Sequence, residues 1–133
     1  PGWAGWGQDV NEDSVVLLVE YGRFQALFAG DAGFPAEADL RGRVGPVDLL
    51  KVGHHGSRGS TGEEWLDSLR PAVAVISVGR NDYGHPAPAT LARLTAHRVR
   101  LWRTDRDGTV SVTTDGGQMR VQGARETFDL DLR

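Results

Sequence analysis

Short apolar runs alternate along this chain with segments of helical composition, and this alternation restricts the fold more than any other feature. Runs rich in Val, Leu, Ile, Ala and Phe lie at residues 14–21, 23–29, 47–52 and 72–78. Runs of about four to eight such residues are typical of strands, and the single Gly22 between the first two predicts a tight hairpin. Helix-forming segments lie at 34–41, 61–69 and 90–96. The sequence therefore predicts an α/β fold with a sheet layered by helices.

The remainder of the chain continues the same pattern. Shorter strands are predicted at 99–103, 109–113, 119–121 and 127–130, joined by turns that contain Asp and Gly. Thr61 followed by Glu64 predicts a capping box at the start of the second helix. Residues 1–13 show no periodicity and are interpreted as an irregular lead-in. One folded unit is therefore expected over residues 14–133.

Composition and charge exclude several classes of protein. The longest apolar stretches have about eight residues, far fewer than the roughly 20 needed to cross a bilayer. The net charge of −3 is unlike that of a dedicated nucleic-acid-binding surface, which is usually strongly basic. Five Arg residues cluster near the C-terminal side of the third predicted helix: Arg93, Arg98, Arg100, Arg103 and Arg106. Such a cluster is more often a solvent-exposed face than a surface that binds backbone phosphates. The aromatic residues expected in the core are Trp65, Trp102 and Phe128.

Polar residues directly follow several of the predicted strands. Asp31 comes after the second apolar run, His54 and His55 after the third, and His85 lies in the long turn after the fourth. In α/β sheets, ligands bind where strands end. These residues are therefore expected to meet at one edge of the sheet.

Asp31 and the two adjacent histidines are candidate metal ligands. Because the chain has no Cys, a metal would be bound through oxygen and nitrogen, which suits Zn, Mn or Fe, and hydrolytic sites often hold two such ions. On an extended backbone the rings of His54 and His55 would point to opposite sides, so one is expected to bind metal and the other to meet substrate. Plainer roles stay open: Asp31 also fits a turn or helix cap, and the histidines fit an exposed loop.

Other polar residues near these positions also have two interpretations. The hydroxyl or the backbone N–H at Ser57 could face an oxyanion. His85 precedes a helix, where a phosphate can meet backbone N–H groups, but it also fits a turn. Asn11 and Ser14 fit ordinary turn and capping positions before the first strand. His97 lies at a predicted helix end, where a cation is favourable, and is interpreted as structural.

Several short motifs occur in a fixed order along the chain. They are N-E-D-S at 11–14, A-G-D at 29–31, L-K-V-G-H-H-G-S at 50–57, A-V-I-S-V-G-R-N at 74–81, Y-G-H-P at 83–86 and R-T-D-R-D-G at 103–108. This series resembles the metallo-β-lactamase-fold region of the ComEC family of competence proteins, over roughly residues 9 to 113. The resemblance is specific because the motifs recur in order and at compatible spacing.

The resemblance implies an αββα sandwich of the metallo-β-lactamase type, of which this chain would be the C-terminal half. It also implies two divalent metal ions, Mn or Zn, in the complete domain. Asp31 would bridge the metals and His55 would bind one of them. His54 would then lie on the phosphate side, and His85 would act as an acid or base facing the substrate. The substrate-binding residues implied are Asn11, Ser14, Ser57 and Arg80.

The function implied by the resemblance is that of a nuclease, which cuts DNA phosphodiesters during DNA uptake in natural transformation. In that family the domain is proposed to degrade the strand that is not transported, and the rest of the protein forms a membrane channel. The full-length protein would then be membrane-associated, while this part would be soluble. Two alternatives stay open: a hydrolase of the same fold that acts on another phosphoester, and a non-catalytic binding or assembly module.

One part of the family pattern is absent from this sequence. The family has a His-x-x-x-Asp-His-type signature and a further His in the first half of the domain, and this chain contains neither. The chain on its own is therefore expected to bind metal weakly or not at all. Half a sandwich would also expose a sheet face or edge, which favours pairing with another copy or with the remainder of the polypeptide.

Overall fold

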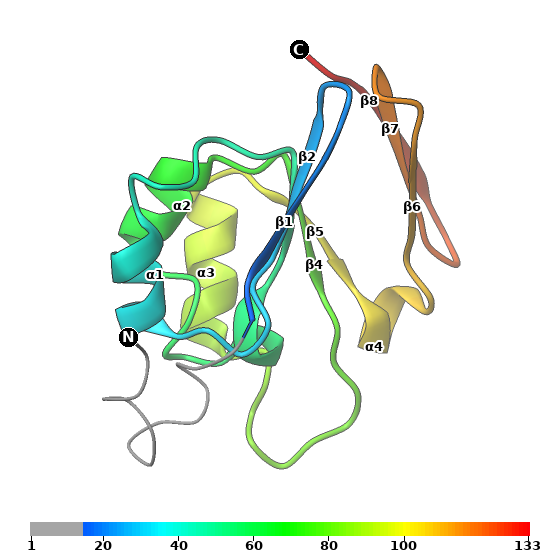
Figure 1. Ribbon diagram of the computed structural model, residues 1–133. Coiled ribbons are helices and arrows are strands. Elements are labelled where there is room, and N and C mark those ends of the chain that lie inside the picture. Colours follow the sequence, from blue (N-terminus) through cyan, green and yellow to red (C-terminus); the bar gives the residue numbers. More distant parts are fainter. Residues whose placement is uncertain (1–14) are drawn as a thin grey trace.

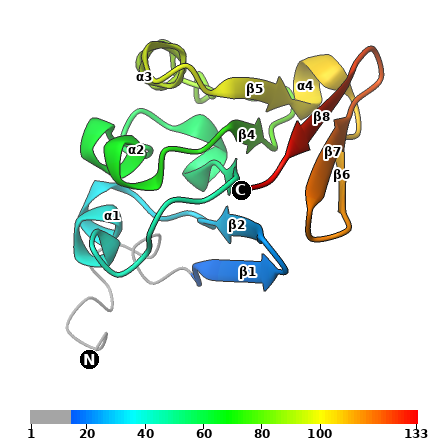
Figure 2. The same ribbon diagram turned by 90° about the horizontal axis from the view of Figure 1, so that it is seen from above.

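The computed structural model describes residues 15–133, and a five-stranded sheet lies at its centre (Figures 1 and 2). Its strands, in spatial order, are β1 (Leu17–Tyr21), β2 (Phe24–Phe28), β3 (Leu49–Lys51), β4 (Val73–Ile76) and β5 (Arg100–Arg103). β1 and β2 form the predicted antiparallel hairpin, and β2 to β5 are parallel. The carboxyl ends of the four parallel strands therefore lie at one edge of the sheet.

Three helices cover one face of this sheet, and a small antiparallel sheet covers the other (Figure 2). The helices are α1 (Phe34–Leu40), α2 (Glu63–Leu69) and α3 (Pro88–Ala96), and the small sheet is formed by β6 (Ser111–Thr114), β7 (Gln118–Gln122) and β8 (Thr127–Asp131). Short helical turns are η3 (Gly53–Gly56) and α4 (Thr104–Asp107). The predicted α/β fold, with a mixed sheet and layered helices, is confirmed. Within residues 15–133 the layers are helix, sheet and sheet, and no helical layer lies beyond the small sheet (Figure 1).

Each face of the large sheet buries its own hydrophobic core. Along β2, Leu27 belongs to the core under the helices and Phe24 to the core under the small sheet, as the alternation of side chains in a strand requires. Trp65 is 2% exposed in the first core and Trp102 is 1% exposed in the second, so both are core residues as predicted. Phe128 is partly buried and packs against the second core.

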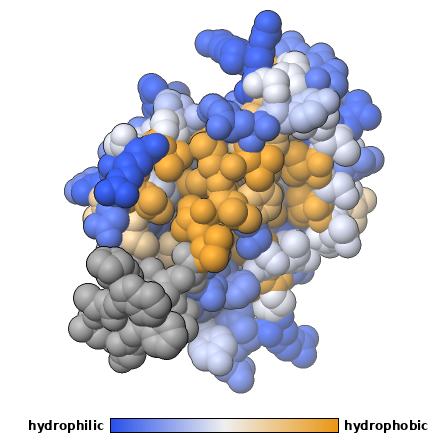
Figure 3. All heavy atoms as spheres, in the orientation of Figure 1, coloured by the Kyte–Doolittle hydropathy of each residue, from blue (hydrophilic) through white to orange (hydrophobic). Residues whose placement is uncertain are grey.

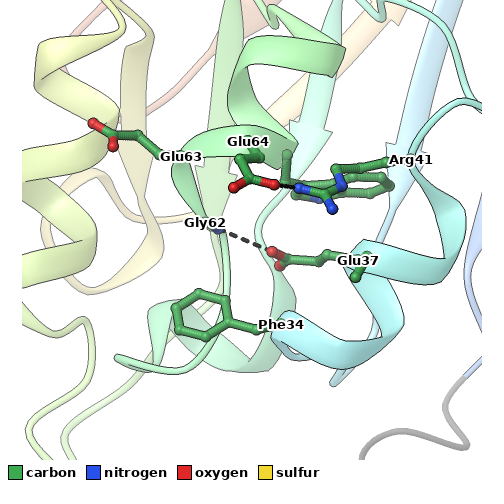
Figure 4. Close-up of a pocket in the computed structure, with 8 residues that line it drawn as sticks. Phe34, Glu37, Arg41, Gly62, Glu63 and Glu64 are labelled. Carbon is green, nitrogen blue, oxygen red and sulfur yellow. Dashed lines mark hydrogen bonds and ion pairs between the residues drawn. The ribbon is translucent and has the colours of Figure 1, made fainter.

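The start of α2 differs from the predicted capping box. Gly62 is the N-cap and no side chain caps it from within the helix, because Thr61 lies before it with a φ of 58°. The buried carboxylate of Glu37, from α1, accepts hydrogen bonds from the N–H groups of Thr61 and Gly62. Glu64 pairs instead with Arg41, as Figure 4 shows. The capping-box prediction was therefore wrong, because a neighbouring helix supplies the acceptor.

β1 is an edge strand with exposed apolar side chains on both faces. All five of its residues are exposed, and its outer edge has no paired strand among the described residues. Figure 3 shows a continuous apolar area in this part of the surface. The large hydrophobic side chains that are exposed on β1, just before it and on its partner strand β2 are Val15, Leu17, Leu18, Val19, Tyr21 and Phe28. The described part of the chain contains no helix that is both long and apolar enough to cross a membrane.

Candidate functional site

Three loops meet at the carboxyl ends of β2, β3 and β4. The backbone N–H of His54 donates to the carbonyl of Gly30 at 2.8 Å, which joins the loop after β3 to the loop after β2. The N–H of Ala87 donates to the carbonyl of Gly56 at 2.9 Å, which joins the same loop to the segment after β4. The predicted gathering of polar residues at strand ends is therefore observed for these loops.

Two glycines make this close approach possible. A Cβ added at Gly53 would lie 2.8 Å from the carbonyl oxygen of Ala32, a distance that real side chains do not tolerate. A Cβ added at Gly56 would lie 2.8 Å from the Cβ of Pro86, and Gly56 also has a φ of 80°, which favours glycine. The Gly residues on either side of the histidine pair thus let the central loop contact both of its neighbours.

The histidine pair lies in a left-handed turn and not on an extended backbone. His54 has a φ of 49° and His55 a φ of 55°, so the extended conformation expected from the sequence was wrong. The two rings nevertheless have different neighbours. The ring of His54 lies edge-on to that of His85, with centroids 5.5 Å apart, whereas the Nδ1 atom of His55 lies 2.6 Å from the carbonyl oxygen of Ser77.

The contact with Ser77 determines which nitrogen of His55 carries the hydrogen. A carbonyl oxygen can only accept, so Nδ1–H must be the donor in this bond. In the neutral ring, Nε2 then keeps its lone pair, available to a metal or a proton. Histidines that bind metals commonly donate their second ring N–H to a carbonyl or carboxylate in this way.

His85 lies in the loop after β4 and lines a hollow of about 230 Å³. Partial burial lowers its pKa below the ordinary value of 6.5, and the charges of His54 and His55 lower it further. The ring of Tyr83 stacks on His85 at a centroid distance of 5.7 Å. The lining residues are His55, Val78, Gly79, Arg80, Asn81, Tyr83 and His85.

Asn81 holds this loop in shape, a role that the sequence did not reveal. Its side-chain nitrogen donates to the carbonyls of Gly79 at 3.0 Å and His85 at 2.8 Å. Its side-chain oxygen accepts from the N–H groups of Tyr83 and His85, both at 3.0 Å. Asn side chains commonly mimic backbone turns in this manner, so an Asn within a Gly- and Pro-rich turn was the available signal.

Lys51 is a second residue near the site that sequence reasoning missed. It is the last residue of β3 and is partly buried. Burial lowers its pKa below the ordinary value of 10.5, and the negative charge of Asp31 opposes that shift. Asp31 itself is partly buried in the turn after β2. Lys51 and Asp31 thus lie close enough to interact electrostatically, at the strand ends from which the loops of the site begin.

The remaining predicted substrate-binding residues differ in their exposure to solvent. Arg80 is exposed and lines the hollow beside His55 and His85. Ser57 is 7% exposed, and its carbonyl accepts three hydrogen bonds from within the protein. The predictions for Asn11 and Ser14 lie outside the described residues.

His97 and most of the Arg cluster are bound to other parts of the chain. His97 bonds the carbonyl of Arg93 and the carboxylate of Asp67, both at 2.8 Å, which confirms its structural interpretation. Arg93 donates to the carbonyls of Arg58, Ser60 and Thr61. Ion pairs join Arg100 to Glu126, Arg103 to Asp105, and Arg106 to Asp107. The cluster is therefore not a row of unpaired cations.

The described residues do not by themselves complete a metal site. No group of three or more His, Asp or Glu side chains within residues 15–133 is arranged to hold one ion. Asp31 and His55 are oxygen and nitrogen donors of the right chemical kind, but they are too few. A second hollow, of about 320 Å³ between α1 and α2, contains no imidazole among its lining residues (Figure 4).

No protein-family model matches this chain. It is 43% identical to ComE operon protein 3 of Bacillus subtilis over 75% of its length, and 37% identical to Recombination protein 2 of Haemophilus influenzae over 89%. It is 36% identical to Competence protein ComA of Neisseria gonorrhoeae over 88% of its length. The chain spans only 13%, 15% and 18% of these three relatives. Its homologues are thus competence proteins of the ComEC family, matched over a short part of each.

Proposed function

We propose that this chain, homologous to a segment of competence proteins, is the part of a DNA-uptake protein that acts on phosphodiester bonds. The observation that carries the proposal is the meeting of three loops, with His54, His55 and His85, at the carboxyl ends of parallel strands. The homologues support a role in DNA uptake. Hydrolysis of the DNA backbone is our inference from the chemistry of the site.

The described side chains suit the handling of a phosphodiester. The lowered pKa of His85 favours its neutral ring near neutral pH, and a neutral ring can accept a proton. Exposed Arg80, at the rim of the same hollow, would attract a phosphate oxygen. His54 contacts the ring of His85 and would lie on the phosphate side.

The proposal extends to a divalent metal, Zn or Mn, with Asp31 and His55 as two of its ligands. The Ser77 contact of His55 supports this choice over His54, because it leaves Nε2 unprotonated. Further donors must come from outside residues 15–133, since these residues hold no group of three ligands. A metallo-β-lactamase-type domain completed by other parts of a longer protein is the arrangement that we propose.

The exposed β1 strand is the proposed contact with the remainder of that protein, which we expect to include a membrane channel. It exposes apolar side chains on both faces, and no strand within residues 15–133 pairs with its outer edge; both features favour the addition of another strand. A second copy of the chain is the other occupant considered. Sedimentation of the chain with and without the preceding part of the polypeptide distinguishes them, because self-association should disappear when that part is present.

The test of the function is transformation by a longer protein that carries this segment. His55→Ala and His85→Ala should each lower the transformation frequency by roughly 100-fold or more, since acid–base and metal-binding groups contribute on that scale. His97→Ala is the matched control, because His97 bonds Asp67 away from the hollow, and it should be close to neutral. Equal frequencies in all three variants would contradict a role for the site.

The nuclease itself is tested with the purified complete domain. With Mn or Zn added, it should cut DNA, and Asp31→Ala should abolish the cleavage. Absence of cleavage with either metal, together with unchanged transformation of the variants, would leave no support for hydrolysis.

A second candidate function is a non-catalytic binding or assembly module. It is favoured by the lack of a three-ligand metal group within residues 15–133. Calorimetry on the complete domain distinguishes the two, because a module that has lost its metals should show no heat of binding with Zn or Mn. The variant His55→Ala serves as the reference titration.

A further inference from the structure

The left-handed conformation of the histidine pair requires an explanation from its surroundings. His54, His55 and Gly56 have successive φ values of 49°, 55° and 80°. Residues with a Cβ rarely adopt this conformation, and two in succession persist only where surrounding contacts determine them. The question is which contacts hold this turn.

A buried serine lies directly behind the turn. The Ser60 hydroxyl is within hydrogen-bonding distance of the carbonyls of Gly53, at 2.9 Å, and Ser57, at 3.1 Å. These two carbonyls flank the histidine pair on either side. Ser60 is 0% exposed, so its hydroxyl has no competition from solvent. The single hydroxyl hydrogen of Ser60 is shared between these two carbonyls, so one side chain joins the start of the turn to its end.

Two helices support this serine from behind. From α3, the hydroxyl of Thr90 donates to the Ser57 carbonyl at 2.8 Å, and Arg93 donates to the Ser60 carbonyl at 3.0 Å. From α1, Glu37 accepts from the N–H of Gly62 at 2.9 Å. These groups do not line the hollow that contains His55 and His85. The network is therefore joined to the site through the backbone of the turn and not through side chains that line the hollow.

We propose that Ser60 is a positioning residue, which holds the histidine pair in its left-handed turn by bridging the carbonyls of Gly53 and Ser57. Its removal lets the turn relax toward ordinary backbone angles. His54 then loses its place against His85, and His55 loses its contact with Ser77. Any consequence for catalysis rests on the proposed function, but the conformational claim does not.

The experiment uses nuclear magnetic resonance on the 133-residue chain with Ser60→Ala. The reporter is exchange of the Ser57 amide, which bonds the carbonyl of His54 at 3.0 Å and so closes the turn. In the variant this amide should exchange at least about tenfold faster, because local opening becomes easier. The ring-to-ring nuclear Overhauser effect between His54 and His85 should be lost. Exchange at Val121, in the other core, should be unchanged.

The matched control is Thr104→Ala. The Thr104 hydroxyl donates to the carbonyl of Val78 at 2.9 Å and accepts from its N–H at 2.8 Å, so this variant also removes a side chain that bonds the backbone at two points. It should leave exchange of the Ser57 amide within about twofold of the unsubstituted chain. A general loss of stability would accelerate exchange in both variants alike.

A second variant covers the case in which Ser60→Ala does not fold. Thr90→Val keeps the shape of the side chain, removes the other hydroxyl on the Ser57 carbonyl, and should accelerate exchange of that amide to a smaller extent. The proposal is overturned if the variant that folds shows unchanged exchange of the Ser57 amide and keeps the contact between the His54 and His85 rings. Neither amide exchange nor the nuclear Overhauser effect depends on activity. A negative result for the role of Ser60 is therefore distinct from a failure of the proposed function.

Discussion

β4 and β1 are both apolar strands of one sheet, yet their surroundings are opposite. In β4, Val73, Ala74 and Ile76 are all 0% exposed, because β3 and β5 flank the strand and both faces are covered. In β1, Leu17 is 56% and Val19 is 42% exposed. The difference shows that an apolar run determines a strand, whereas its burial depends on neighbours that the strand itself does not supply.

The candidate site shows the same contrast. The loops after β3 and β4 are fixed by contacts within the chain, which include the close approach at Gly53 and the four hydrogen bonds of Asn81. The donors near Asp31, by contrast, are incomplete among the described residues. In the arrangement that we propose, one further part of a longer protein would cover the exposed strand and supply the remaining ligands.

Ile76→Ala should have the largest effect on stability. Ile76 is fully buried in the core under the helices, and removing such a side chain from a close-packed site costs about 3 kcal/mol of unfolding free energy. Denaturant unfolding followed by Trp fluorescence measures it. Leu18→Ala on β1 is the comparison, and its effect should be much smaller because Leu18 is 42% exposed. Similar losses in both variants would contradict the contrast between the strands.

Gly53→Ala should have the next largest effect. The added Cβ would meet the carbonyl oxygen of Ala32 at 2.8 Å, and overpacking of this kind costs about 2 kcal/mol. Gly79→Ala is the matched control, since a Cβ there meets nothing within 4 Å. Thermal unfolding should separate the two variants. If Gly53→Ala behaves like Gly79→Ala, the two loops are not in contact in solution.

The sequence was sufficient for the elements of the fold and for the edge of the sheet where the site lies. Strand runs, the hairpin at Gly22 and the polar residues at strand ends are local patterns, and local patterns can be read without tertiary contacts. The short motifs also indicated the competence proteins to which the chain is homologous. The histidines at 54, 55 and 85 could therefore be assigned to one end of the sheet.

Two local predictions, the extended histidine pair and the capping box, were wrong because contacts outside each segment determine the backbone there. Ser60 and Thr90 of α3 bond carbonyls at the ends of the left-handed turn at His54 and His55, and we propose that Ser60 holds it. The cap of α2 comes from Glu37, 25 positions before Gly62. Local sequence favoured an extended backbone at His54 and His55 and a capping box at the start of α2. Contacts with other parts of the chain overrode both preferences.

Protonation of His97 should make the unfolding free energy depend on pH, with a smaller effect than either substitution above. The hydrogen bond to the Arg93 carbonyl raises the pKa of His97 above its ordinary value of 6.5, and Asp67 raises it further. A raised pKa adds stability below about pH 6.5, and this stability is lost as the pH rises through the higher pKa of the folded state. The gain should be about 0.5 kcal/mol, because Asp67 is mostly exposed.

Asp67→Asn provides the test of this pH dependence. The unfolding free energies of the two proteins should differ most near pH 5 to 6 and converge toward about pH 9, as the imidazole loses its proton. A difference that grows with pH would have the wrong sign and would exclude a charged His97 as its cause.

The smallest effect on stability is expected for Val19→Lys in β1. Val19 is 42% exposed at the sheet edge, so Lys there should change the unfolding free energy by no more than about 0.5 kcal/mol. Val73→Lys, the same exchange in fully buried β4, should leave the chain unfolded. Sedimentation should show less self-association of Val19→Lys, because a charged edge strand resists pairing. If Val19→Lys unfolds the chain as Val73→Lys does, β1 is already covered in solution, and a second copy of this chain is then the neighbour that covers it.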